Sequence, residues 1–160
     1  MCGIAGLFGY SETSPPVDRN SLDRMTRAMI PRGPDGDGTW ISGENGVGLG
    51  HRRLSIIDLS EGGAQPMVLD GNRLSITYNG EIYNFRALRE ELECEGAKFV
   101  SGSDTEVLLH LYDRHGTSMV EKLRGMFSFV IFDRDKRGIF LARDGFGIKP
   151  LYYADDGATF

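Results

Sequence analysis

The hydrophobic pattern of the first thirty residues predicts a strand followed by a helix. The run GIAGLFG at residues 3–9 is short and apolar, and its glycines allow close packing, as in a buried strand that the two following prolines end. Leu22, Met25 and Met29 then recur at the spacing of one helix face. The polar residues 18–21 supply candidate N-caps, so we expect a helix that ends near the turn-rich segment PRGPDGDG.

Strand-forming residues dominate the next part of the chain. TWIS at 39–42, VGLGHRRLSII at 47–57 and RLSITYN at 73–79 have strand character, and a short turn and the long connection SEGGAQPMVLDGN separate them. This pattern predicts an antiparallel sheet.

Two helices are expected after these strands. Asn84 is placed to cap a helix that runs through Leu88 and Leu92 to Gly96. Ser103 and Glu106 have the S-x-x-E spacing of a capping box, which predicts a second helix to about residue 115. Asp104 would then lie in the first turn without serving as the cap, so its carboxylate is available for another role.

The last forty residues return to strand patterns. MFSFVIFD, the turn RDKRG and GIFLARD predict a hairpin, and LYYADDG with the final ATF suggests the start of another. No repeat or low-complexity linker divides the chain. We therefore expect one α+β domain in which helices cover layered sheets.

Composition narrows the function classes. The 160 residues are 40% hydrophobic and 26% charged, with a net charge of −5 and scattered basic residues, so a nucleic-acid partner is not expected. The two cysteines form no disulfide or zinc spacing, which favours a reducing, cytoplasmic compartment. The N-terminus lacks the basic region of a signal peptide, and no apolar run approaches the ~18 residues of a membrane span.

Cys2 directly follows the initiator methionine. Removal of Met1 would leave Cys2 with both a thiol and a free α-amine, so a nucleophile and its base would share one residue. The alternative is that Cys2 is a small hydrophobic residue at the start of a buried strand.

Further polar residues are expected where strands meet loops. Arg53 or Arg52 could bind a carboxylate bidentately, and two acids, Glu81 and Asp104, could receive the donors of an α-ammonium group. Together these side chains suit an amino-acid ligand.

The pair Asn79-Gly80 suits an oxyanion hole. The Asn side-chain NH₂ and the following backbone N–H can point at one oxygen, and glycine permits close approach. The alternative is a type I′ hairpin turn, for which Asn-Gly is the leading dipeptide.

Other candidate motifs are weaker. A cysteine–histidine dyad with His51, His110 or His115 is conceivable, although the last two lie on a predicted helix. GVGLG lacks the strand-GxGxxG-helix order of a nucleotide site, and DGDG is too short for a calcium loop. Cys94, on a predicted helix, is expected to pack as a small hydrophobic residue without a catalytic role.

Eight blocks in order carry a family resemblance: MCGIAG, RGPDG, HRRLSIIDLS, GAQPM, YNGEIYNF, GSDTEV, GMFSFVIFD and RDGFGIKPLYY. The chain resembles, over nearly its whole length, the glutaminase domain of glutamine-dependent asparagine synthetases, within the class II glutamine amidotransferases. The resemblance implies an N-terminal-nucleophile hydrolase fold, an αββα four-layer sandwich of two antiparallel sheets.

The resemblance also implies hydrolysis of L-glutamine to glutamate and ammonia, and it gives the candidate residues roles. Cys2 would be the nucleophile after Met1 is removed, and Asn79 with Gly80 the oxyanion hole. The residues implied in substrate binding are Arg53 for the carboxylate, Glu81 and Asp104 for the ammonium group, and the backbone near Ile56. Arg32 and His51 would be supporting residues.

In the family, ammonia passes to a C-terminal synthetase domain, so residues 1–160 are expected to be a glutaminase domain cut near its C-terminal end. No metal or cofactor is expected here, because ATP and Mg²⁺ would belong to the absent synthetase domain. The resemblance allows a homodimer. Two alternatives stay open: a non-catalytic glutamine-binding module, and an N-terminal-nucleophile amidase for another small amide.

Overall fold

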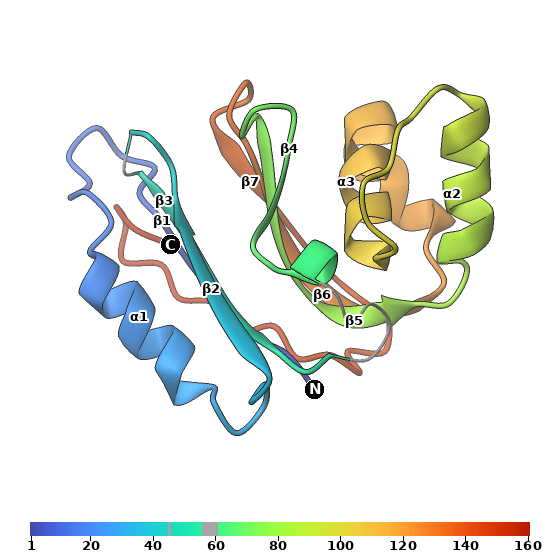
Figure 1. Cartoon of the computed structure of the whole chain (residues 1–160). Coiled ribbons are helices and arrows are strands. Elements are labelled where there is room, and N and C mark those ends of the chain that lie inside the picture. Colours follow the sequence, from blue (N-terminus) through green and yellow to red (C-terminus); the bar gives the residue numbers. More distant parts are fainter. Residues whose placement is uncertain (45, 56–60) are drawn as a thin grey trace.

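Two antiparallel sheets are stacked between helices in the computed structural model, which describes residues 1–44, 46–55 and 61–160. Along the stack the order is helix α1, the first sheet, the second sheet, and the helix pair α2 and α3 (Figure 1). This arrangement confirms the expected α+β class and the αββα order of layers.

The first sheet carries the N-terminus. It has the antiparallel order β1-β3-β2, and its strands are β1 (Gly3–Phe8), β2 (Gly36–Ile41) and β3 (Val47–Arg53). Helix α1 (Arg19–Ala28) covers the outer face of this sheet (Figure 1).

The glycines of GVGLG allow α1 to lie close to β3. A Cβ on Gly48 would lie 2.7 Å from Val17 Cγ1, and one on Gly50 would collide with Thr26 Oγ1. Val47 and Leu49 alternate with these glycines and are buried between the sheets. The motif therefore has a packing role in the fold.

The second sheet has the order β4-β5-β6-β7, and all its neighbouring strands are antiparallel. Its strands are β4 (Met67–Leu69), β5 (Leu74–Ile82), β6 (Gly125–Asp133) and β7 (Gly138–Arg143). Helices α2 (Phe85–Cys94) and α3 (Asp104–His115) pack on its outer face, and the short 3₁₀ helices are η1 (Glu61–Gly63) and η2 (Gly116–Lys122).

Two hydrophobic cores hold these layers together. The larger one joins alternate residues of β5 and β6, such as Ile76 and Phe129, to leucines of α2 and α3. The smaller one lies between the sheets, where Val47 and Leu49 meet Val130 and Phe132. The period-2 alternation of β6 thus supplies both cores.

Helix α1 begins as expected but turns a different face inward. The Asp18 side chain caps the helix by accepting hydrogen bonds from Asn20 N and Ser21 N. Leu22 is buried, but Met25 is 40% exposed, and Thr26 is buried in its place. Thr26 donates to Leu22 O at 2.9 Å, which satisfies its hydroxyl in this apolar contact.

The expected caps of α2 and α3 form only in part. Asn84 lies at the N-cap position of α2, but within the described residues its side chain makes no hydrogen bond to the helix. It donates to Lys122 O and accepts from Arg124 N, two groups distant in the sequence. Ser103 caps α3 through Thr105 N. Glu106 does not return to Ser103: its carboxylate accepts from the backbone upstream, at residues 100 and 101.

Two strand predictions need correction. The connection before residue 73 contains the strand β4, which pairs with the start of β5. LYYADDG forms no strand and no hairpin. Instead Phe160 exchanges two backbone hydrogen bonds with Phe8, at 2.9 and 2.8 Å, so the final residues pair with the end of β1.

Among the described residues, no helix has the length and apolar character needed to cross a bilayer.

Candidate active site

Cys2 lies immediately before β1, at the end of the first sheet that faces the loop after β3. The antiparallel register pairs Gly3 with Arg52, which brings Cys2 beside the residues that follow β3. The Cys2 sulfur lies 3.3 Å from Leu54 N and 3.7 Å from Leu54 O, and Arg32 Nε donates to Cys2 O at 3.1 Å. The backbone and the sulfur of Cys2 are therefore both held in place.

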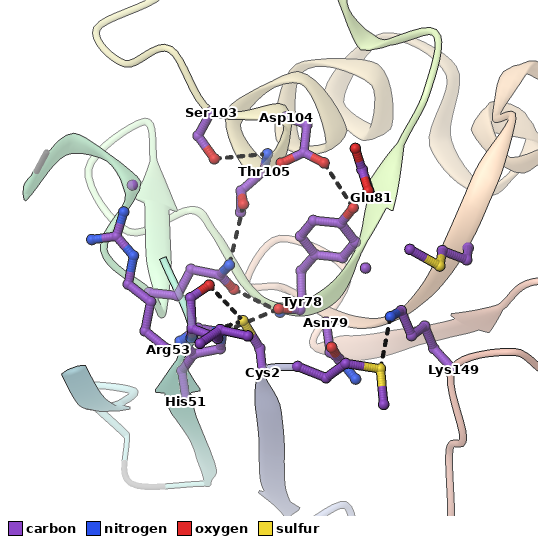
Figure 2. Close-up of a pocket in the computed structure, with 16 residues that line it drawn as sticks. Cys2, His51, Arg53, Tyr78, Asn79, Glu81, Ser103, Asp104, Thr105 and Lys149 are labelled. Atoms are coloured by element: carbon purple, nitrogen blue, oxygen red, sulfur yellow. Dashed lines mark hydrogen bonds between the residues drawn. The ribbon is translucent and has the colours of Figure 1, made fainter. Parts of the chain in front are cut away.

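The polar residues singled out in the sequence meet in one pocket (Figure 2). It is lined by Cys2, Arg53, Asn79, Gly80, Glu81 and Asp104. These residues come from the position before β1, the end of β3, the second half of β5 and the first turn of α3. Ile56 lies outside the described residues.

Asn79 and Gly80 lie inside β5, paired with Ser128 and Phe127 of β6, so the hairpin-turn interpretation is wrong. Strand β4 covers β5 only as far as Ile76, which leaves the rest of that edge open to the pocket. Because no strand among the described residues pairs with this part of β5 on the side of β4, an Asn-Gly pair within the strand can still face a ligand.

The open edge of β5 directs one backbone donor toward the pocket. Tyr78 N donates to Gln65 Oε1 at 2.7 Å, and Ile82 N donates to Asp104 Oδ2 at 3.1 Å, so both N–H groups point away from β6. Because N–H directions alternate along a strand, the N–H of Gly80 points to the same edge. No side chain or loop carbonyl in the described part of the chain accepts a hydrogen bond from it.

The Asn79 side chain supplies a second donor beside Gly80. Asn79 is only 4% exposed, and within residues 1–44, 46–55 and 61–160 no hydrogen bond engages its side-chain amide. A Cβ on residue 80 would lie 2.6 Å from Tyr78 Cε2 and collide with Met126 O, so only glycine fits there. The two donors can therefore approach one ligand oxygen closely.

Asp104 is a buried carboxylate held by two donors. Its Oδ2 accepts from Tyr78 Oη at 2.8 Å and from Ile82 N. Burial raises the pKa of Asp104, the two hydrogen bonds oppose that rise, and the charge of Glu81 adds to it. Burial likewise raises the pKa of Tyr78, so its hydroxyl stays protonated and acts as the donor.

Arg53 and the two acidic residues lie on different sides of the pocket. Figure 2 shows Arg53 on one side and Glu81 with Asp104 on the other. A guanidinium group matches a carboxylate, and two carboxylates attract an ammonium group. The pocket is thus charged for a zwitterionic α-amino acid.

His51 is buried behind the pocket. Its Nε2 lies 3.1 Å from Tyr78 O, which can only accept, so Nε2 carries the proton. The pKa of His51 is lowered to about 4, mainly by burial and in part by the charges of Arg53 and Arg52, although the hydrogen bond to Tyr78 O opposes the shift, so the ring is neutral near pH 7. In the described residues the Cys2 sulfur contacts Leu54 as its hydrogen-bond partner, which argues against a Cys2–His51 dyad.

Gln65, Tyr78 and Lys149 are among the pocket residues to which the sequence interpretation assigned no role. All three stand within the blocks that carry the family resemblance, GAQPM, YNGEIYNF and RDGFGIKPLYY. A single sequence contains no signal that pairs Tyr78 with Asp104 or turns the Lys149 side chain inward, because both depend on contacts between distant segments.

Cys94 is not among the residues that line this pocket. It is exposed at the end of α2, so the expectation that it packs as a small hydrophobic residue is wrong. In the described residues, no group of three or more histidine, cysteine or acidic side chains could hold a metal ion.

Known proteins resemble this chain in both sequence and fold. Residues 1–160 match the family described as glutamine amidotransferase domain. Glutamine-hydrolyzing asparagine synthetase 1 of Bacillus subtilis (strain 168) is 46% identical over 96% of this chain and 24% of its own length. Glutamine-hydrolyzing asparagine synthetase 3 of the same strain is 41% identical over 100% of this chain and 26% of its own.

Two further comparisons extend this picture. Amidase chry2 of Gibberella zeae is 40% identical over 96% of this chain and 24% of its own length. The solved structure of glutamine phosphoribosylpyrophosphate amidotransferase from B. subtilis shares the fold, with a TM-score of 0.67 and 22% identity over 88% of this chain and 37% of that one. The chain spans about a quarter of the length of the synthetases it matches.

Proposed function

Because the chain belongs to the glutamine amidotransferase domain family, we propose that it hydrolyses the side-chain amide of L-glutamine to glutamate and ammonia. One observation carries the proposal: a cysteine sulfur, two unengaged N–H donors and charges suited to an amino acid line the same pocket. No other described part of the chain combines these groups.

The pocket binds the substrate through the two charged groups on its α-carbon, the carboxylate and the ammonium group. Arg53 binds the α-carboxylate, and Glu81 and Asp104 receive the α-ammonium group. The backbone near Ile56 is a further proposed contact. Binding at this end directs the side-chain amide toward Cys2, so the reacting carbon is positioned by groups that do not react.

The first chemical step forms a thioester. The Cys2 thiol gives its proton to the Cys2 α-amine, which is free once Met1 is removed, and the sulfur attacks the amide carbon. The C=O electron pair moves to oxygen, where Asn79 Nδ2 and Gly80 N donate to the negative charge. The α-ammonium then protonates the leaving nitrogen, the C–N bond breaks, and ammonia departs.

Hydrolysis of the thioester completes the cycle. The α-amine, neutral again, removes a proton from water, and the hydroxide attacks the thioester carbon. The C–S bond breaks, glutamate leaves, and the sulfur recovers the proton. Asn79 and Gly80 stabilise the second oxyanion as they did the first.

The ammonia has a proposed destination outside these residues. We place this domain in a longer protein whose ATP-dependent synthetase domain would accept the ammonia, because asparagine synthetases are prominent among its relatives. ATP and Mg²⁺ would serve that domain. A cytoplasmic location is consistent with the unpaired cysteines, Cys2 and Cys94.

A second candidate function is hydrolysis of a different small amide by the same N-terminal cysteine. It has one observation in its favour: a relative with 40% identity is named an amidase. The charged groups Arg53, Glu81 and Asp104 favour glutamine, because a simple amide without a zwitterionic end would bring no charges that match theirs.

A glutaminase assay on protein with Met1 removed tests the proposal. Cys2→Ala should abolish ammonia release, whereas Cys94→Ser, the matched change at the exposed cysteine, should leave it intact. A glutamine-mimicking electrophile should label Cys2 in peptide mapping. Glutamine binding without turnover in processed protein would favour a binding module, and turnover of another amide alone would favour the second candidate.

A further inference from the structure

Lys149 is a buried cation in the active-site pocket. It is only 4% exposed, although lysine is among the residues least often buried. Its side chain lines the pocket that contains Cys2, and Figure 2 shows it pointing inward on the side of Asn79.

The segment after β7 holds Lys149 in this position. The Asp144 carboxylate accepts hydrogen bonds from the backbone N of Phe127, Phe146, Ile148 and Lys149, at 2.9 to 3.2 Å. Burial raises the pKa of Asp144, but these four donors outweigh it and lower the pKa. Asp144 thus fixes the backbone at Lys149. The negative charge of Asp144 is directed to these backbone N–H groups and not to the Lys149 ammonium group.

The ammonium group of Lys149 has a weak partner. Nζ lies 3.0 Å from Met1 Sδ, a thioether that is a poor acceptor. Within the described ranges, no carboxylate lies within 4.0 Å of Nζ in an ion pair, although Glu81 and Asp104 line the same pocket. Buried charges are usually paired with an opposite charge, so this one is placed for an anion that the chain itself does not provide.

The position of Met1 indicates where that anion would be. Met1 is bonded to Cys2 and lines the pocket, where its sulfur is the contact of Lys149 Nζ. Removal of Met1 would take away the thioether and leave Nζ facing the space beside the reactive residue. In the proposed binding mode, Arg53, Glu81 and Asp104 hold the other, α-carbon end of the substrate.

We propose that Lys149 provides positive charge for the reacting end of glutamine, stabilising the oxyanion formed when the Cys2 sulfur attacks. This rests on the proposed function, and it adds a charged group to the two neutral donors, Asn79 and Gly80. The same charge attracts the side-chain carboxylate of the product glutamate. Neutral glutamine has no charge at that end, so its binding depends little on Lys149.

The kinetic test uses Lys149→Met, which keeps the length and volume of the side chain and removes the charge. We expect kcat to fall by roughly tenfold or more with KM within about twofold, because the charge acts on the transition state. Lys149→Arg should recover most of the rate. Lys122→Met, the same change at an exposed lysine paired with Glu91, is the matched control.

A binding test separates this proposal from the proposed function. In Cys2→Ala protein with Met1 removed, Lys149→Met should weaken the binding of L-glutamate roughly tenfold. The affinity for L-glutamine should be nearly unchanged, because only glutamate carries a charge at the reacting end. An unchanged glutamate-to-glutamine affinity ratio, or an unchanged kcat, would overturn the role of Lys149 alone. If neither amino acid binds, the proposed function fails and the role of Lys149 fails with it.

Discussion

Tyr78 Oη donates a 2.8 Å hydrogen bond to Asp104 Oδ2, which joins the middle of β5 to the first turn of α3. The backbone of Tyr78 is fixed as well, because Gln65 binds its N–H and His51 binds its carbonyl. Gln65 also reaches Thr105, the neighbour of Asp104, at 3.2 Å. Tyr78 therefore positions the carboxylate that we propose receives the substrate ammonium group.

The pH dependence of KM should report on this pair. Asp104 must be ionised to bind an ammonium group, and its pKa is raised above the usual 3.8. KM for glutamine should therefore rise as the pH falls through a value above 3.8. Tyr78→Phe removes a bond that lowers this pKa, so the rise in KM should begin at a higher pH.

Tyr112→Phe is the matched control for this measurement, because Tyr112 is also buried but its hydroxyl contacts Lys136, outside the pocket. Steady-state kinetics from pH 4 to pH 8 suffice. Superimposable KM profiles for wild type and Tyr78→Phe would mean that Tyr78 does not tune Asp104.

Protein that keeps Met1 should be nearly inactive. In that form the Cys2 nitrogen is part of a peptide bond and cannot act as the base, and the Met1 side chain lines the pocket and contacts Lys149. Glutaminase rates of retained and processed samples, each verified by mass spectrometry, test this. Equal rates would rule out the Cys2 α-amine as the base.

Substitutions at Arg53 and Asn79 should affect different kinetic constants. Arg53 binds a carboxylate whose charge is constant through the reaction, so Arg53→Lys should mainly raise KM by removing bidentate geometry. Asn79 donates to an oxygen that becomes negative only during attack, so Asn79→Ala should lower kcat by roughly 10²–10³ with little change in KM. Thermal unfolding of both variants checks that the fold is retained.

If Asn79→Ala kept the wild-type kcat, Asn79 would have only a structural role in β5. If Arg53→Lys lowered kcat and left KM unchanged, the α-carboxylate would have to bind elsewhere.

His51 should make the fold less stable in acid. Its pKa is about 4 in the folded chain and 6.5 in the reference state, so the unfolded chain binds the proton more tightly. The stability that neutral His51 allows is fully present above pH 6.5 and is lost as the pH falls toward 4, by about 3 kcal/mol. Denaturant unfolding of wild type and His51→Gln across this range measures the difference.

As the pH falls from 6.5 to 4, the free energy of unfolding of wild type should fall relative to that of His51→Gln, because only wild type carries the His51 ring. Parallel pH profiles would show that His51 titrates alike in the folded and unfolded chains.

The sequence by itself determined the elements that local patterns specify. Alternation predicted β5 and β6, and the polar stretch 18–21 predicted the start of α1, because side-chain periodicity and capping act within a few residues. The order of motifs indicated the family, and with it pocket residues such as Cys2, Arg53 and Asn79. These inferences needed no knowledge of which segments touch.

The tertiary structure decided what depends on distant partners. Asn79-Gly80 has the local signature of a turn, but pairing with β6 makes it part of a strand, and the short β4 leaves the edge beside it open. Met25 fits a helix face but is exposed, because the glycines of β3 bring Thr26 inward instead. Lys149 is turned into the pocket by a carboxylate that binds four backbone N–H groups. Such positions depend on contacts between segments far apart in the chain. Local sequence patterns cannot predict those contacts, because they reflect only interactions within a few residues.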